Sequence, residues 1–148
     1  MTSIPQQATI LLIDDEPQNL RMMVEFLEEE GYQILIAQDG EGGLRRAAYV
    51  RPDLILLDAI LPDIDGFMLC EQLKKNEITS QIPIIFLTIL TIPEDRVRAI
   101  EAGASDYVTK PVQWEELLLR INIHMHIRDL TRQLHEAKGR LSEYEKRE

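Results

Sequence analysis

Apolar and polar residues follow two spacings along this chain, and the two spacings alternate. Short runs of consecutive apolar residues predict buried strands at 9–15, 33–37, 53–58, 82–88 and 106–110. Between them, apolar residues recur every three or four positions, which predicts amphipathic helices at 17–31, 39–50, 65–76, 93–103 and from about 113 to the end. Strands that alternate with helices predict a parallel sheet with helices on both faces.

Four of the five predicted strands end in side chains that carry a charge or a hydroxyl. The first ends in Asp14 and Asp15, the third in Asp58, the fourth in Thr88 and the fifth in Lys110. Parallel strands all end at the same edge of a sheet, and ligands of open α/β sheets bind there, where the strand order reverses. If the first and third strands are neighbours, three carboxylates therefore meet at this edge.

Three carboxylates in one place repel one another, and a hard divalent cation removes that conflict. Mg²⁺ suits a few carboxylates together with water and a phosphate oxygen. An aspartate beside Mg²⁺, with a lysine and a hydroxyl nearby, can attack phosphorus and become an acyl phosphate. The residues thus predict a phosphoryl-accepting site, with Lys110 and Thr88 sharing the charge of the transferred group.

Four motifs, in this order and spacing, resemble the receiver domain of two-component response regulators: "LLIDDE", "LILLDAILPDIDG", "FLT" and "GASDYVTKP". The resemblance implies an α/β, flavodoxin-like, doubly wound sheet of five parallel strands in the order 2-1-3-4-5. It covers about residues 8–123. We therefore expect an N-terminal tail at 1–7, a receiver domain at 8–123 and a coiled-coil helical extension at 124–148.

The resemblance also implies which residues form the phosphorylation site. By position, Asp58 is the phosphoacceptor. Asp15 is a direct ligand of Mg²⁺, Asp14 acts through water, and Asp58 and the backbone carbonyl of Ile60 complete the ligands from the protein. The apolar run that ends in an acid, "DLILLD", is then explained, because the strand carries Asp58 to the site.

The switch residues follow from the same resemblance. Thr88 is the hydroxyl that binds the phosphoryl oxygen, Lys110 is the cation that pairs with it, and the bond from Lys110 to Pro111 is cis in the family. Tyr107 occupies the position of the switch aromatic residue. Phosphorylation would then pull Thr88 toward Asp58 and let Tyr107 move inward.

The function implied is a Mg²⁺-dependent signalling switch that takes its phosphoryl group from a histidine kinase or a phosphotransfer protein. Its only catalysis would be its own phosphorylation and dephosphorylation, so it is not classed as an enzyme. The residue after the switch hydroxyl is usually small in the family and is Ile89 here, and Ile60 and Leu90 are also bulky. These side chains support an alternative, a degenerate receiver that acts only in protein interaction and dimerisation.

The C-terminal segment has an apolar repeat of its own. Apolar residues recur at alternating intervals of four and three over about three heptads, as in a coiled coil, at Ile123, Ile127, Leu130, Leu134, Ala137, Leu141 and Tyr144. We expect a parallel homodimer through this helix, which also carries the output. The alternative is a single helix folded back on its domain. Heptads that run this far favour either a longer chain with an effector domain or a stand-alone adaptor.

Composition excludes several other classes of protein. The net charge of −10 over 148 residues argues against a nucleic-acid surface, and no apolar run approaches the roughly 20 residues that cross a membrane. Cys70 is the only cysteine, which fits a cytoplasmic location. The histidines at 124, 126 and 135 include no pair at a spacing of four, so no metal site is expected there; His135 is interpreted as a solvated helix position.

Overall fold

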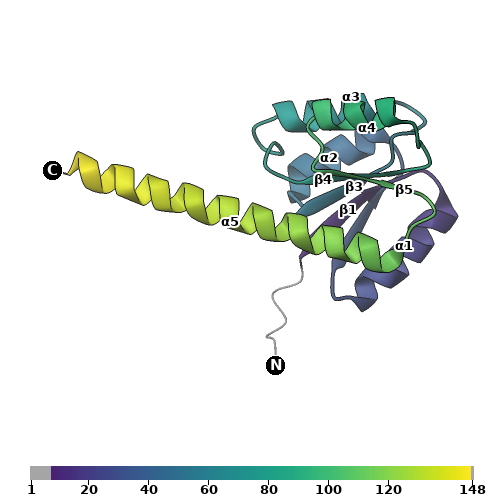
Figure 1. Cartoon of the computed structure of the whole chain (residues 1–148), viewed down its shortest axis with the longest axis horizontal. Coiled ribbons are helices and arrows are strands. Elements are labelled where there is room, and N and C mark those ends of the chain that lie inside the picture. The colour runs from purple at the N-terminus through teal and green to yellow at the C-terminus, as the bar shows by residue number, and fades with distance from the viewer. Residues whose placement is uncertain (1–7, 148) are drawn as a thin grey trace.

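The computed structural model describes residues 8–147, so the tail predicted at 1–7 lies outside the described part of the chain. Strands and helices alternate without exception, as Figure 1 shows. The elements are β1 (Thr9–Ile13), α1 (Pro17–Glu29), β2 (Gln33–Ala37), α2 (Gly40–Val50), β3 (Leu54–Leu57), α3 (Gly66–Lys75), β4 (Ile84–Thr88), α4 (Pro93–Glu101), β5 (Asp106–Thr109) and α5 (Trp114–Lys146).

The five strands form one parallel sheet in the order β2-β1-β3-β4-β5, which confirms the predicted fold and order. Side chains at alternate positions of the strands point to opposite faces. One face packs against α2, α3 and α4 and the other against α1 and α5 (Figure 1). The central strands are buried on both faces, which is why their sequences read as unbroken apolar runs.

Several predicted elements extend one or two residues beyond the observed ones. Asp39 and Asp65 were included in helices but are their N-caps, and their carboxylates accept hydrogen bonds from the backbone N–H of Gly42 and Phe67. Aspartate is favoured at this position because it satisfies a backbone donor that the helix leaves unpaired. The periodicity therefore located the helices, whereas capping chemistry sets where they begin.

Helix α5 is continuous across residue 123, where the predicted receiver domain ends and the extension begins. Its 33 residues span about 50 Å at 1.5 Å per residue. Leu117, Ile121 and Met125 are buried against the sheet, and the C-terminal part of the helix extends away from the domain (Figure 1). None of the described helices is both long and apolar enough to span a bilayer.

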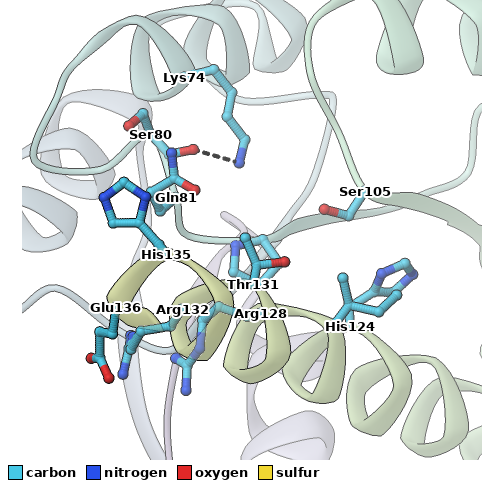
Figure 2. Close-up of a pocket in the computed structure, with 12 residues that line it drawn as sticks. Lys74, Ser80, Gln81, Ser105, His124, Arg128, Thr131, Arg132, His135 and Glu136 are labelled. Atoms are coloured by element: carbon cyan, nitrogen blue, oxygen red, sulfur yellow. Dashed lines mark hydrogen bonds between the residues drawn. The ribbon is translucent and has the colours of Figure 1, made fainter. Parts of the chain in front are cut away.

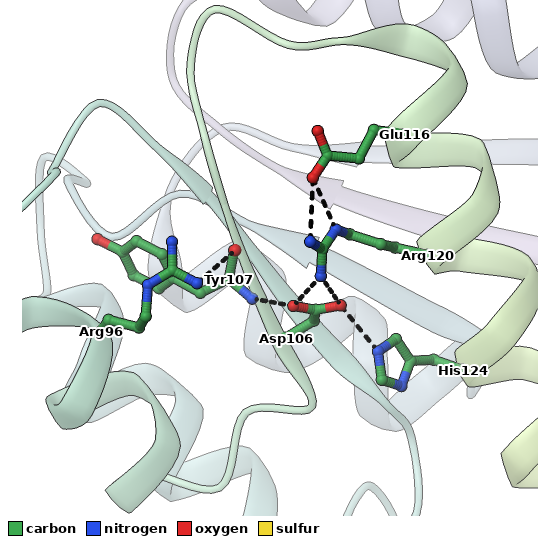
Figure 3. Close-up of polar contacts among 6 residues, drawn as sticks. All are labelled: Arg96, Asp106, Tyr107, Glu116, Arg120 and His124. Carbon is green, nitrogen blue, oxygen red and sulfur yellow. Dashed lines mark hydrogen bonds and ion pairs between the residues drawn. The ribbon is translucent and has the colours of Figure 1, made fainter. Parts of the chain in front are cut away.

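Two aspartates at the amino ends of strands hold the first half of α5 in place. Asp106 on β5 accepts hydrogen bonds from Arg120 at 2.8 Å and pairs with the His124 ring at 3.0 Å (Figure 3). Asp53, just before β3, pairs with Arg128 further along the helix. Burial alone would raise the pKa of Asp106, but the Arg120 guanidinium and the backbone N–H of the next residue bring it below its usual value.

Candidate functional site

The three predicted carboxylates do meet at the carboxyl edge of the sheet. Asp14 and Asp15 follow β1, and Asp58 follows β3, the neighbouring strand at the point where the strand order reverses. One carboxylate oxygen from each residue lies within 4.8 Å of the other two. Asp14 is only 5% exposed. Carboxylate oxygens gathered this closely are the donors that Mg²⁺ prefers, so the residues present fit that ion.

Lys110 reaches into this cluster from the end of β5. Its ammonium nitrogen lies 2.8 Å from Asp14 Oδ2 and 3.1 Å from Asp58 Oδ2. Burial alone would lower the pKa of Lys110, but the hydrogen bond to Asp14 and the charge of Asp58 raise it above its usual value, so the side chain stays cationic. The peptide bond between Lys110 and Pro111 is cis, as the resemblance implied.

The backbone of Leu90 connects the two switch residues. Thr88, fully buried at the end of β4, accepts a hydrogen bond on Oγ1 from the Leu90 N–H at 3.4 Å. The Tyr107 hydroxyl donates to the Leu90 carbonyl at 2.7 Å. A movement of Thr88 therefore acts on the same residue whose backbone holds Tyr107.

The Tyr107 ring lies inward, and its movement on phosphorylation stays a prediction. The residue is 4% exposed, and the Arg96 guanidinium carbon lies 5.1 Å from the centre of its ring (Figure 3). Burial raises the pKa of Tyr107, so its hydroxyl keeps the proton that it donates. Tyr107 is thus held by both the β4–α4 segment and α4.

The three bulky side chains expected to crowd the site have different surroundings. Leu90 packs against the core that α2, α3 and α4 cover. Ile60 and Ile89 are 47% and 64% exposed, so they border the site from the solvent side rather than filling it. Asp58 additionally accepts a hydrogen bond from the Ile60 N–H at 3.0 Å, which orients its carboxylate.

Two further aspartates after β3 shape the loop, in keeping with the preference of aspartate for turns and helix caps. Asp63 accepts hydrogen bonds from the backbone N–H groups of Gly40 and Glu41 at 2.8 and 3.0 Å, and these bonds hold its pKa below the usual value. Asp65 caps α3 and pairs with Arg98 at 2.8 Å. Both carboxylates have structural partners, and neither belongs to the acidic cluster.

Gly66 lets this loop pass close to the backbone of Asp58. A Cβ atom added there would lie 2.6 Å from both the Asp58 carbonyl oxygen and Ala59 Cα, which are backbone atoms that cannot rotate away. We expect Gly66→Ala to lower the free energy of unfolding by about 1–3 kcal/mol, the usual cost of overpacking. Urea denaturation of the variant and the wild type measures this difference in the free energy of unfolding.

Gly139→Ala is the matched control for that variant. No heavy atom lies within 4 Å of a Cβ added at Gly139, and alanine favours a helix over glycine by about 1 kcal/mol. We therefore expect no loss of stability. An unchanged urea midpoint in Gly66→Ala would show that the Asp58 loop moves aside freely.

The geometry agrees with a comparison of the sequence with known families. Residues 10–122 match the model of the response regulator receiver domain. This chain belongs to the receiver domain family. It is also 42% identical over 112 residues to the DNA-binding dual master transcriptional regulator RpaA of Synechocystis, a match that covers 76% of this chain and 46% of RpaA. The chain thus spans about half the length of that relative.

Two other proteins resemble this receiver over most of their own lengths. Protein PilH of Pseudomonas aeruginosa is 40% identical over 115 residues, which are 78% of this chain and 95% of PilH. The receiver domain of the sensor histidine kinase PA1611 from the same species, solved with a magnesium ion in its active-site cleft, is 32% identical with a TM-score of 0.76. That match covers 81% of this chain and 98% of the solved one.

Sequence reasoning missed the polar contacts between the receiver and α5. The partners Asp106 and Arg120 are separated by 14 residues, and Asp53 and Arg128 by 75. No spacing rule relates residues so far apart, and each looks like an ordinary surface charge in the sequence. The only feature of the sequence that could have indicated these pairs was the opposite charge of their members, on elements that a receiver fold brings together.

Proposed function

We propose that this receiver is a phosphorylation-dependent signalling switch in which Asp58 accepts a phosphoryl group from a histidine kinase or a phosphotransfer protein. One observation carries the proposal: Asp58 lies beside two further carboxylates and within 3.1 Å of the Lys110 ammonium. A carboxylate that becomes an acyl phosphate needs nearby positive charge for the phosphoryl oxygens. Lys110 supplies one such charge, and the acidic cluster can hold a second as Mg²⁺.

The residues have separate tasks in this transfer. An Asp58 oxygen attacks phosphorus while the bond between phosphorus and the donor's histidine nitrogen breaks. Lys110 then pairs with a phosphoryl oxygen, and the Thr88 hydroxyl turns from Leu90 to donate to another. Asp15, Asp58 and the Ile60 carbonyl, with Asp14 through water, would hold Mg²⁺, which would supply further neutralisation of charge. We assign the protein no other catalysis, and a cytoplasmic location stays a prediction.

The output is proposed to run through α5. Its buried residues, Leu117, Ile121 and Met125, lie on one face. At about 100° per residue, the heptad residues lie on the opposite face. Their exposed fractions are 45–63% for Ile123, Ile127, Leu130, Leu134, Leu141 and Tyr144. An apolar stripe turned away from the domain is available to another helix, which supports the parallel homodimer over a helix folded back on its domain.

Because Tyr107 is already inward, the signal is proposed to start at Thr88. Turning the Thr88 hydroxyl toward a phosphoryl group releases the Leu90 N–H, which is the start of the segment that leads to α4. Tyr107 remains bonded to the Leu90 carbonyl and lies on β5 next to Asp106, the residue that holds α5. This chain of contacts supports a route from Asp58 to the helix.

Beryllofluoride, a mimic of the acyl phosphate, separates this proposal from the alternative of a degenerate receiver. We expect the intact chain to bind it in the presence of Mg²⁺, seen as shifts in the amide NMR signals around Asp58, Thr88 and Leu90. Omitting Mg²⁺ should remove the shifts, because the three carboxylates would then repel the anionic mimic. Equal spectra with and without beryllofluoride would favour an interaction module.

A further inference from the structure

A groove of about 450 Å³ lies between α5 and the segment that joins α3 to β4 (Figure 2). Pro83 and Ser105, which line it, precede β4 and β5, so the groove is at the amino edge of the sheet, opposite the aspartate cluster. Its volume is within the range of small-molecule sites, about 300–1,000 Å³. The α5 side begins at His124, beyond the family match at 10–122, so the groove depends on this chain's helical extension.

Lys74 brings a positive charge into this groove from the last turn of α3. Its ammonium nitrogen donates to the backbone carbonyls of Ser80 at 3.1 Å and Ile82 at 2.6 Å, and Figure 2 shows it directed toward the space above α5. An ammonium has three donors, and both acceptors are neutral. Burial lowers the pKa of Lys74. No carboxylate among residues 8–147 pairs with Lys74, so this half-buried ammonium has no direct counter-charge in the described part of the chain.

Two of the other basic side chains around the groove differ from Lys74 because they have acidic partners. Arg128 is paired with Asp53 and Asp129, and His124 is paired with the carboxylate of residue 106. His135 rises from α5 toward the α3–β4 segment (Figure 2). Although the chain has a net charge of −10, the lining of the groove includes only one acid, Glu136.

We propose that this groove binds a small organic anion, with its carboxylate or phosphate group at the Lys74 ammonium and its apolar body against Pro83. The third N–H of Lys74 and the hydroxyls of Ser105 and Thr131 are the donors that such a group needs. The ligand would contact both α5 and the α3–β4 segment. It would therefore stabilise the helix at the point where it leaves the domain, by the linkage that applies to any ligand of the folded state.

Two probes with the same apolar body test the proposal on the full chain. Benzoate and phenyl phosphate are titrated separately while the amide NMR signals are followed, with benzyl alcohol as the neutral counterpart. We expect saturable shifts at residues 80–82, Ser105 and Thr131 with at least one anion, and at least tenfold weaker binding of the alcohol. The tighter anion identifies the head group. Absence of saturable shifts with both anions would overturn the proposal.

Variants then locate the binding. Lys74→Met should raise the dissociation constant at least tenfold, whereas Lys75→Met, on the exposed neighbouring lysine, should leave it unchanged. Because Lys74→Met also removes two bonds to the loop, Thr131→Phe provides a second variant. Thr131 is an exposed residue of α5 that lines the groove. A phenylalanine at this position would fill the groove and would leave the Lys74 hydrogen bonds to the Ser80 and Ile82 carbonyls in place. Binding that survives Thr131→Phe, or that is lost equally in Lys75→Met, contradicts this site.

Discussion

Asp58→Asn is expected to abolish phosphorylation of this receiver by a small phosphodonor. With Mg²⁺ and phosphoramidate, the wild-type chain should gain the mass of one phosphoryl group. The variant should gain none, because an amide cannot form the acyl phosphate. The fold should survive, since the amide oxygen of the substituted side chain can still accept the hydrogen bond from the Ile60 N–H. Intact-mass spectrometry of both proteins, sampled over time, measures the difference.

Asp65→Asn is the control for that experiment. Asp65 lies on the same loop and caps α3, and asparagine caps a helix about as well as aspartate. Its phosphorylation should therefore match that of the wild type. If Asp58→Asn and wild type were labelled equally, another residue would be the acceptor, and the interpretation of the aspartate cluster would be wrong.

The double substitution of Leu134 and Leu141 by asparagine is expected to convert a dimer into a monomer. Both leucines are exposed in the single chain and would be buried at the seam of a parallel coiled coil. Burying one leucine contributes about 1.5–3 kcal/mol, and a dimer loses four of them. Since each 1.4 kcal/mol is about tenfold in the dissociation constant, dimerisation should weaken by at least about a hundredfold.

Sedimentation at tens of micromolar, with and without beryllofluoride, measures this change in the full chain. The control replaces Glu143 and Lys146 by asparagine, which keeps the net charge and alters helix positions outside the apolar stripe; it should remain dimeric. A wild-type monomer in both states would show that the stripe is not a dimer seam. A tenfold shift in dimer population on activation needs only about 1.4 kcal/mol of differential stability.

Much of the fold could be predicted because it depends on local periodicity. Buried strands such as β3 and β4 consist of consecutive apolar residues, and the helices show the three-to-four spacing of one apolar face. The site was predictable for a related reason. Asp58 and Lys110 each come at the end of a predicted strand, so knowing that parallel strands end at one edge places them together.

Features that depend on distant pairs could not be predicted in this way. The position of Tyr107 is set by the carbonyl of Leu90 and by Arg96, and nothing in the local sequence states that these groups are near. In the sequence, Lys74 looks like one of two adjacent surface lysines. In the structure, its ammonium donates hydrogen bonds to the backbone carbonyls of Ser80 and Ile82. His135 is exposed, as interpreted, but the sequence did not indicate that it lines a groove together with Ser80 and Pro83, which are more than 50 residues earlier in the chain.

The length of α5 has a mechanical consequence for any signal that reaches it. Beyond Met125, the last buried residue, the helix continues to Lys146, a lever arm of about 30 Å at 1.5 Å per residue. A tilt of about 5° at its base would displace its tip by roughly 3 Å, about two residues of helical rise. Small rearrangements beside Asp106 and Arg120 are thus amplified geometrically, so displacement should be sought at the tip of the helix rather than at its anchor.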